Sequence, residues 1–130
     1  MNLRIGVAAA AMLALSAASR ADADDALSYA QLTNCAAFNM LLMQSYSLGD
    51  QAAARQDDIA ISKRRSMALT LAAAMLSKQD SKVVADDVVS QNAAMIKSLS
   101  DAEAAAKLVT DNMTPCATLG KVADEALNEQ

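Results

Sequence analysis

The feature that most constrains this fold is a stretch without charge, residues 26–49, in the first half of the chain. Its central part, residues 32–46, contains the only phenylalanine and one of the two cysteines. Polar residues interrupt it too often for a helix that spans a bilayer. We expect it to form the central helix of a small bundle. On that helix one side would carry Leu32, Cys35, Leu42, Met43 and Tyr46.

The rest of the composition favours helices over strands. The 130 residues are 54% hydrophobic, enough for one domain with its own core, yet only 2% aromatic. Three glycines and one proline leave few positions for hairpin turns. Alanine, leucine and methionine are frequent, and all three have high helix propensity. The predicted fold class is all-α, a small up-down-up-down four-helix bundle.

The N-terminus has the three parts of a secretory signal peptide in the expected order. A start with one positive charge, at Arg4, precedes an apolar run over residues 5–18. A small-x-small cleavage site follows at residues 21–23. We therefore expect a signal peptide over residues 1–23.

The predicted mature chain is a single helical-bundle domain over residues 24–130. Cleavage after Ala18 or Ala21 is an alternative. An uncleaved amphipathic anchor or an ordinary first helix is another. Cleavage would place the mature protein in the periplasm or the extracellular space.

The charge balance is not that of a nucleic-acid-binding protein. The formal net charge is −4, with 11 basic and 15 acidic residues, and the basic residues are scattered. Removal of residues 1–23 takes away two basic residues and one acidic residue, so 9 basic residues face 14 acidic ones. We expect no nucleic-acid partner and no stable membrane insertion of the mature chain.

Export decides what the two cysteines do. In an oxidising compartment, Cys35 and Cys116 are expected to form a disulfide. The bond would close a loop of about 80 residues, which the chain-entropy model values at roughly 4.5 kcal/mol. A redox-active pair is the alternative, but the chain has no Cys-x-x-Cys motif and no basic residue beside either thiol.

Two antiparallel helices are expected in the first half of the mature chain. The first would start near Asp24 and Asp25, whose carboxylates suit a helix N-terminus, and run to about Ser47. Gly49 and Asp50 are candidates for the C-cap of this helix and the N-cap of the next. So short a connection predicts antiparallel neighbours.

The second helix, over residues 51–77, has two different halves. Its second half is uncharged from residue 66 and brings Met67, Leu71 and Met75 together on one side, with Ala74 beside them. Its first half carries several charges. We expect these to be solvated where the helix overhangs the bundle, or else to form a surface on which Arg64 or Arg65 contacts a partner.

The second half of the chain can be interpreted in two ways. Apolar positions recur at spacings of three and four from residue 84 to residue 113, which favours one long helix over residues 82–112. The alternative is a break at Ser100, where Ser-x-x-Glu resembles a capping box. Thr114 and Pro115 predict a restart and a last helix over residues 116–128.

Two asparagines lie within apolar stripes. Asn39 falls between Cys35 and Leu42, and Asn92 falls between Val88 and Met95. A buried amide without a hydrogen bond costs about 1–3 kcal/mol. We expect both to be satisfied core groups that fix helix register, with a ligand contact inside the bundle as the alternative.

Residues that would carry catalysis are nearly absent. The chain has no histidine, which removes the commonest general base, the usual zinc ligand and the usual haem ligand. The acidic doublets match neither a carboxylate pair nor a calcium loop. Met40 and Met43 could hold Cu(I), although methionines at helical spacing usually fill a core. No cofactor is predicted.

The function that the sequence favours is a non-enzymatic, exported protein-binding or accessory module, whose partner is another protein or a second copy of itself. A charge-free first helix and methionine-rich faces are compatible with association. The alternative is a binder of a small apolar ligand or a soft metal inside the bundle, at Met40, Met43 and Asn39. An enzyme is the third class and the least supported by the residues present.

Overall fold

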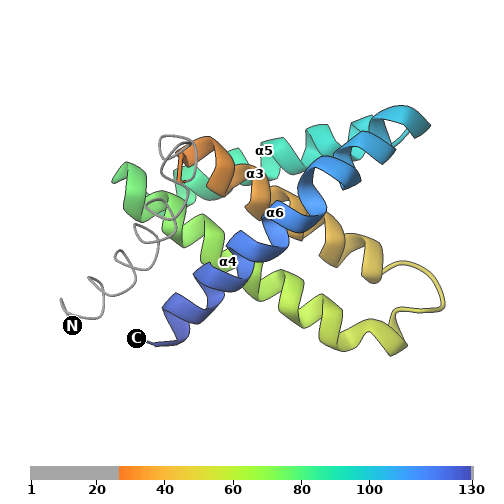
Figure 1. Ribbon diagram of the computed structural model, residues 1–130, viewed down its shortest axis with the longest axis horizontal. Coiled ribbons are helices and arrows are strands. Elements are labelled where there is room, and N and C mark those ends of the chain that lie inside the picture. The colour runs from red at the N-terminus through yellow and green to blue at the C-terminus, as the bar shows by residue number, and fades with distance from the viewer. Residues whose placement is uncertain (1–26, 130) are drawn as a thin grey trace.

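The computed structural model describes residues 27–129, and the helices there confirm the all-α prediction (Figure 1). Four α-helices pack against each other in a bundle, and a short 3-10 helix, η2, precedes the second of them. The predicted signal peptide and the first residues of the predicted mature domain lie outside the described residues. The bounds are Tyr29–Tyr46 for α3, Ala53–Arg55 for η2, Gln56–Ser77 for α4, Ser81–Ser98 for α5 and Ala102–Asn128 for α6.

Helices α3 and α4 form an antiparallel hairpin that is the middle of the molecule. Successive helices alternate in direction, and α6 crosses over the hairpin on its way back (Figure 1). Both α5 and α6 contact α3 and α4, whereas α5 and α6 make few contacts with each other. The predicted central helix is therefore central in the structure as well.

Helix α3 starts later than the acidic pair at residues 24–25 suggested. Its N-cap is Ser28, whose hydroxyl accepts a hydrogen bond from the backbone N–H of Gln31 at 3.1 Å. The Gln31 side chain accepts in turn from the Ser28 backbone N–H, which completes a capping box. Two otherwise unpaired backbone donors are satisfied in this way, so the helix begins at Tyr29.

The α3–α4 connection is longer than predicted. Gly49 adopts a positive φ of 73°, which only glycine enters without strain, and it reverses the chain. Asp50 does not cap the next helix, because η2 intervenes and α4 begins at Gln56. The guanidinium of Arg55 lies 4.3 Å from the ring centroid of Tyr46, a cation–π contact that ties the two ends of the connection together.

The hairpin is close-packed because α4 turns small side chains toward α3. Its buried residues are six serines or alanines and one leucine, and the hydroxyl of Ser66 donates to the carbonyl oxygen of Ala36 on α3 at 2.8 Å. Phe38 and Leu32 of α3 fill the space that these small residues leave, and both are fully buried. The buried residues of α4 are Ser62, Ser66, Ala68, Leu69, Ala72, Ala73 and Ala74.

The prediction of one long helix over residues 82–112 is wrong. Helix α5 ends at Ser98, and Asp101 caps α6 by accepting from the backbone N–H groups of Glu103 and Ala104 at 2.9 and 3.4 Å. The cap is therefore Asp101 and not Ser100. Helix α3 has 18 residues and is about 27 Å long, whereas a helix over residues 82–112 would extend about 46 Å. The second half of such a long helix would extend beyond the core, and the turn between α5 and α6 brings the chain back to it.

The predicted restart at Thr114 and Pro115 is also wrong, since α6 continues through Pro115. A proline inside a helix removes the hydrogen bond to the carbonyl four residues earlier, here Asp111, and costs about 3 kcal/mol. Pro115 is exposed, so water reaches this carbonyl more easily than it would in the core. The next residue, Cys116, is fixed to α3 by the disulfide, which holds the helix in place on the C-terminal side of the proline.

None of the helices within residues 27–129 combines the length and the apolar character that crossing a membrane requires.

Candidate interaction surface

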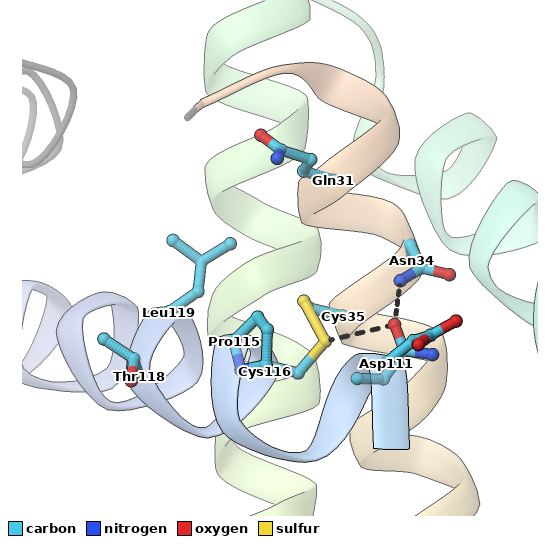
Figure 2. A pocket seen from close by; sticks show the side chains of 9 residues that line it. Gln31, Asn34, Cys35, Asp111, Pro115, Cys116, Thr118 and Leu119 are labelled. Carbon is cyan, nitrogen blue, oxygen red and sulfur yellow. Dashed lines mark hydrogen bonds between the residues drawn. A yellow bond between two sulfur atoms is a disulfide. The ribbon is translucent and has the colours of Figure 1, made fainter. Parts of the chain in front are cut away.

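The predicted disulfide is present and joins α6 to the central helix (Figure 2). The two sulfur atoms of Cys35 and Cys116 are 2.11 Å apart, and the Cα atoms are 4.9 Å apart. Both side chains are buried, at 5% and 1% exposed, and the bond spans 81 residues of sequence. This part of the sequence analysis is confirmed.

An open groove of about 460 Å³ lies beside the disulfide, between α3 and α6 (Figure 2). Asn34 Nδ2 donates across it to Asn112 Oδ1 at 2.7 Å, and Asn112 Nδ2 donates to the carbonyl oxygen of Leu108 at 2.7 Å. Asn112 Oδ1 also lies 3.9 Å from Cys116 Sγ, a van der Waals contact because a disulfide sulfur carries no proton. The lining residues are Gln31, Asn34, Cys35, Asp111, Asn112, Pro115, Cys116, Thr118 and Leu119.

The chemistry of this groove is limited. Its two asparagines are already hydrogen-bonded within the protein, and its sulfur atoms are held in the disulfide. Its one charged residue, Asp111, forms an ion pair with Lys107 at 2.7 Å. The arrangement stabilises the α3–α6 contact and offers few free groups to a ligand.

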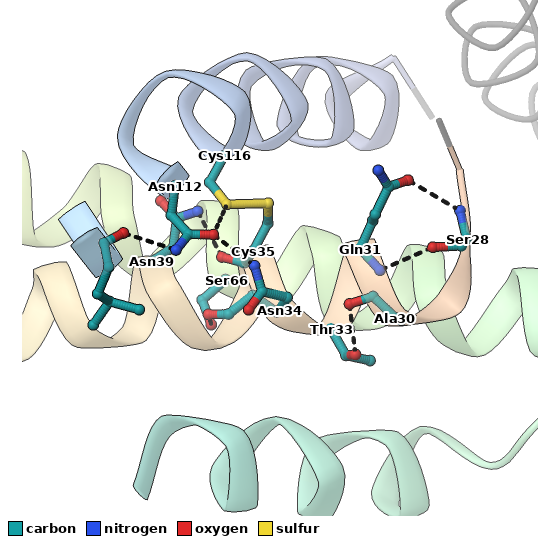
Figure 3. The surroundings of a disulfide bond; sticks show 12 residues. Ser28, Ala30, Gln31, Thr33, Asn34, Cys35, Asn39, Ser66, Asn112 and Cys116 are labelled. Atoms are coloured by element: carbon teal, nitrogen blue, oxygen red, sulfur yellow. Dashed lines mark hydrogen bonds between the residues drawn. A yellow bond between two sulfur atoms is a disulfide. The ribbon is translucent and has the colours of Figure 1, made fainter. Parts of the chain in front are cut away.

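The two predicted buried amides are hydrogen-bonded in different ways. Asn39 is 2% exposed and donates to the carbonyl oxygen of Cys35 at 2.9 Å, within its own helix (Figure 3). Asn92 is 4% exposed and donates between helices, to Gln44 Oε1 at 3.0 Å and to the carbonyl oxygen of Ala37 at 3.3 Å. Only Asn92 therefore links two helices, and the role of both in fixing register stays a prediction.

Asn92 belongs to a ladder of hydrogen bonds between α5 and α3. The preceding residue of α5, Gln91, donates from Nε2 to Oγ1 of Thr33, which lies one turn before Ala37 on α3, at 2.8 Å. The first rung is the hydroxyl of Tyr29 bonded to Asp87. The hydrogen bond to Asp87 raises the pKa of the Tyr29 phenol above its ordinary value, because it stabilises the protonated form. Figure 3 shows α5 on one side of the α3–α4 pair and α6 on the other.

The structure places both candidate arginines where α4 crosses α6. Arg64 Nη2 lies 3.5 Å from Asp124 Oδ2 of α6, with 54% of the arginine side chain exposed. The stem of Arg65 passes against Gly120, where a Cβ atom would come within 3.1 Å of Arg65 Cδ. Both residues therefore hold α4 to α6, and Arg64 still presents half of its side chain to solvent.

The largest departure from the expected packing is on α4. Met67, Leu71 and Met75 are 58%, 43% and 45% exposed, although the sequence places them on an apolar side of the helix. We call these three residues the α4 stripe. The signal that sequence reasoning missed is a second, small-residue face with spacings of three and four, formed by Ser62, Ser66, Leu69 and Ala73.

The two methionines of the alternative soft-metal or apolar-ligand site lie at the edge of the core. Met40 and Met43 are half-buried on α3, and Met40 packs against the core. Within residues 27–129, no three histidine, cysteine, aspartate or glutamate side chains lie close enough together to hold a metal ion.

Comparisons of the chain with models of known protein families, with curated proteins and with solved structures find no match.

Proposed function

We propose that this protein is a non-enzymatic protein-binding module of the periplasm or extracellular space, and that its partner docks on the α4 stripe. The observation that carries the proposal is the inverted packing of α4. This helix buries one leucine, Leu69, among serines and alanines, and it exposes Met67, Leu71 and Met75. A helix that served only the fold would gain more by burying its large apolar side chains.

The arrangement has a physical consequence for association. The stripe lies on adjacent turns of one helix, at spacings of four, so its side chains form one continuous apolar ridge. A partner that covered the ridge would remove all three side chains from water together, at about 25 cal/mol per Å² of apolar surface. Methionine suits such a contact, because its flexible thioether adapts to differently shaped partners.

The proposed location rests on two independent features. The Cys35–Cys116 bond is of the kind that persists in oxidising compartments. The predicted signal peptide over residues 1–23 gives a route to such a compartment. Together they favour a protein that acts outside the cytoplasm.

Site-specific photo-crosslinking in the host cell tests the docking surface. A photoreactive residue replaces Leu71 in one variant and Ile96 of α5 in the control, because the two side chains are similarly exposed, at 43% and 46%. We expect a discrete protein adduct from position 71 and none from position 96. The adduct should disappear when Met67→Ser and Met75→Ser are added.

No adduct from position 71, or equal adducts from both positions, would contradict the proposal. A circular-dichroism melt of each variant shows whether the fold is intact. Because the substituted side chains are about half exposed and lie outside the buried core, we expect melting temperatures close to that of the wild type.

A further inference from the structure

We infer that the segment that docks on the α4 stripe is an amphipathic helix of another protein, with acidic residues beside its apolar face. This inference rests on the proposed function and adds the chemistry of the partner. It follows from where the positive charges of the molecule lie relative to the stripe.

The chain is acidic overall, but α4 is locally basic. Between Asp58 and Asp80 there are four basic residues and no acidic residue, whereas the formal net charge of the whole chain is −4. The four basic residues are Lys63, Arg64, Arg65 and Lys78. The exposed α4 stripe therefore lies in a locally positive segment of an acidic chain.

Two of these charges lie at the ends of the stripe. The spacing from Arg64 through the stripe to Lys78 is three, four, four and three, so Arg64 is one turn before Met67 and Lys78 is one turn after Met75. Lys78 is the C-cap of α4, with a left-handed φ of 58°. The two charges are about 21 Å apart along the helix axis, which matches about four turns of a partner helix.

The charges at these ends remain available to a partner. Lys63 and Lys78 are exposed, and neither forms an ion pair with any residue in the part of the chain that the structure describes. Arg64 reaches Asp124 only at 3.5 Å and keeps 54% of its side chain in solvent. An anionic group on a partner could therefore approach either end of the stripe.

A second copy of this chain does not fit the same face. In a symmetric antiparallel pair centred on Leu71, Met67 of one copy would pack on Met75 of the other. The same symmetry would place Arg64 of one copy beside Lys78 of the other, at both ends of the contact. Two pairs of like charges would then oppose association.

A membrane surface fits the face less well than a protein does. Interfacial helices enter the headgroup region with tryptophan, phenylalanine or leucine, and the α4 stripe has one leucine and no aromatic residue. The positive charge of α4 is local, and the net negative charge of the whole protein reduces its attraction to an anionic bilayer. An acidic, helical protein segment meets both the apolar and the charge requirement.

Two synthetic helical peptides test the inference against the oxidised, signal-free protein. Both carry the same leucine stripe; one has glutamates beside it and the other has lysines. By fluorescence anisotropy we expect the acidic peptide to bind about tenfold more tightly, as two or three partly exposed ion pairs would allow. Its affinity should fall as the salt concentration rises.

Three variants assign the binding to the α4 stripe. Leu71→Ser should weaken binding of the acidic peptide severalfold, and Ile96→Ser on α5 should leave it unchanged. Lys78→Glu should weaken the acidic peptide and strengthen the basic one. Equal affinity for the two peptides, or no effect of Lys78→Glu, would overturn the inference.

The remaining outcomes separate this inference from the proposed function. Dimerisation of the pure protein through the stripe, or binding to vesicles of anionic phospholipid that Leu71→Ser abolishes, would replace the acidic helix with another occupant. A crosslink at position 71 in cells without peptide preference in vitro would keep the docking surface and overturn only the partner chemistry. Absence of that crosslink would overturn the proposed function itself.

Discussion

The two helices that cover the α3–α4 hairpin are held in opposite ways. Helix α6 is covalently attached through Cys116, and its buried residues all lie at or after this position. Helix α5 has no covalent attachment, and its buried residues are spread over its length. Those of α6 are Cys116, Leu119, Gly120, Ala123 and Ala126, and those of α5 are Val84, Val88, Asn92 and Met95.

The difference shows how a small bundle can stabilise a helix that buries little. Leu119 is the only large aliphatic side chain among the buried residues of α6, and glycine and alanine supply most of the rest, so the hydrophobic gain of this helix is small. The disulfide compensates by restricting the unfolded chain. Helix α5 buries two valines and a methionine and adds the ladder from Tyr29 to Asn92, which is sufficient without a crosslink.

Removal of the disulfide should produce the largest effect on stability and should weaken the attachment of α6 more than that of α5. We expect the Cys35→Ala/Cys116→Ala variant to lose about 4 kcal/mol of unfolding free energy, since the bond closes a loop of 81 residues. Chemical denaturation measures the loss. Hydrogen exchange should show that α6 loses protection first, while α5 keeps it. Equal loss of protection in both helices would contradict this account of α6.

The second prediction weakens α5 instead. Asn92→Ala leaves Gln44 Oε1 without its donor from α5 and removes the additional hydrogen bond to the carbonyl oxygen of Ala37, and we expect a loss of about 1–3 kcal/mol. The matched control is Asn112→Ala, which removes an amide that is only partly buried, in the groove beside the disulfide. The control substitution should lower the free energy of unfolding by less than Asn92→Ala does. A larger loss for Asn112→Ala would show that the ladder does not hold α5.

The third prediction concerns the crossing of α6 over α4. The new Cβ of Gly120→Ala would lie 3.1–3.3 Å from three atoms of the Arg65 side chain, closer than ordinary packing allows. Alanine is the better helix former by about 1 kcal/mol, but overpacking typically costs about 1–3 kcal/mol. We expect a net loss of about 1 kcal/mol in thermal or urea unfolding.

A double-mutant cycle isolates the contact in this third prediction. In an Arg65→Ala background, Gly120→Ala no longer meets Cγ and Cδ of the arginine, so its cost should shrink. Additive effects of the two substitutions would mean that the close approach does not limit the crossing.

The sequence was sufficient to predict features that depend on composition or on a single pair of residues. The absence of charge over residues 26–49 predicted the central helix, and the two cysteines of an expected exported chain predicted their bond. Both features are visible locally, or follow from counting. The all-α class follows in the same way from the scarcity of glycine and proline.

Except for the start of α3, which the local capping box of Ser28 and Gln31 sets, the main features that sequence analysis missed depend on tertiary partners. An apolar register continues across residues 99–101. The register alone cannot show that α3 is too short for one helix over residues 82–112 to pack along, so the turn between α5 and α6 was not predicted. A proline normally begins a helix, whereas α6 continues through Pro115, and the next residue, Cys116, is bonded to Cys35 of α3. Helix α4 has two apolar faces, and periodicity cannot tell that the face with the smaller residues is the buried one.

The smallest predicted effect lies at the first rung of the α5 ladder and depends on pH. The hydrogen bond to Asp87 raises the pKa of Tyr29 in the folded protein above its ordinary value of 10.0. The stabilisation is therefore complete below pH 10.0 and is lost as the pH rises through the higher folded value. Urea unfolding at pH 8 and pH 10.5 should show a stability advantage of wild type over Tyr29→Phe that narrows at the higher pH. The Asp87→Asn variant should not lose this stability at alkaline pH, because no carboxylate would then face the Tyr29 phenolate. A stability advantage of wild type over Tyr29→Phe that grows with pH would contradict the assignment of the proton to Tyr29.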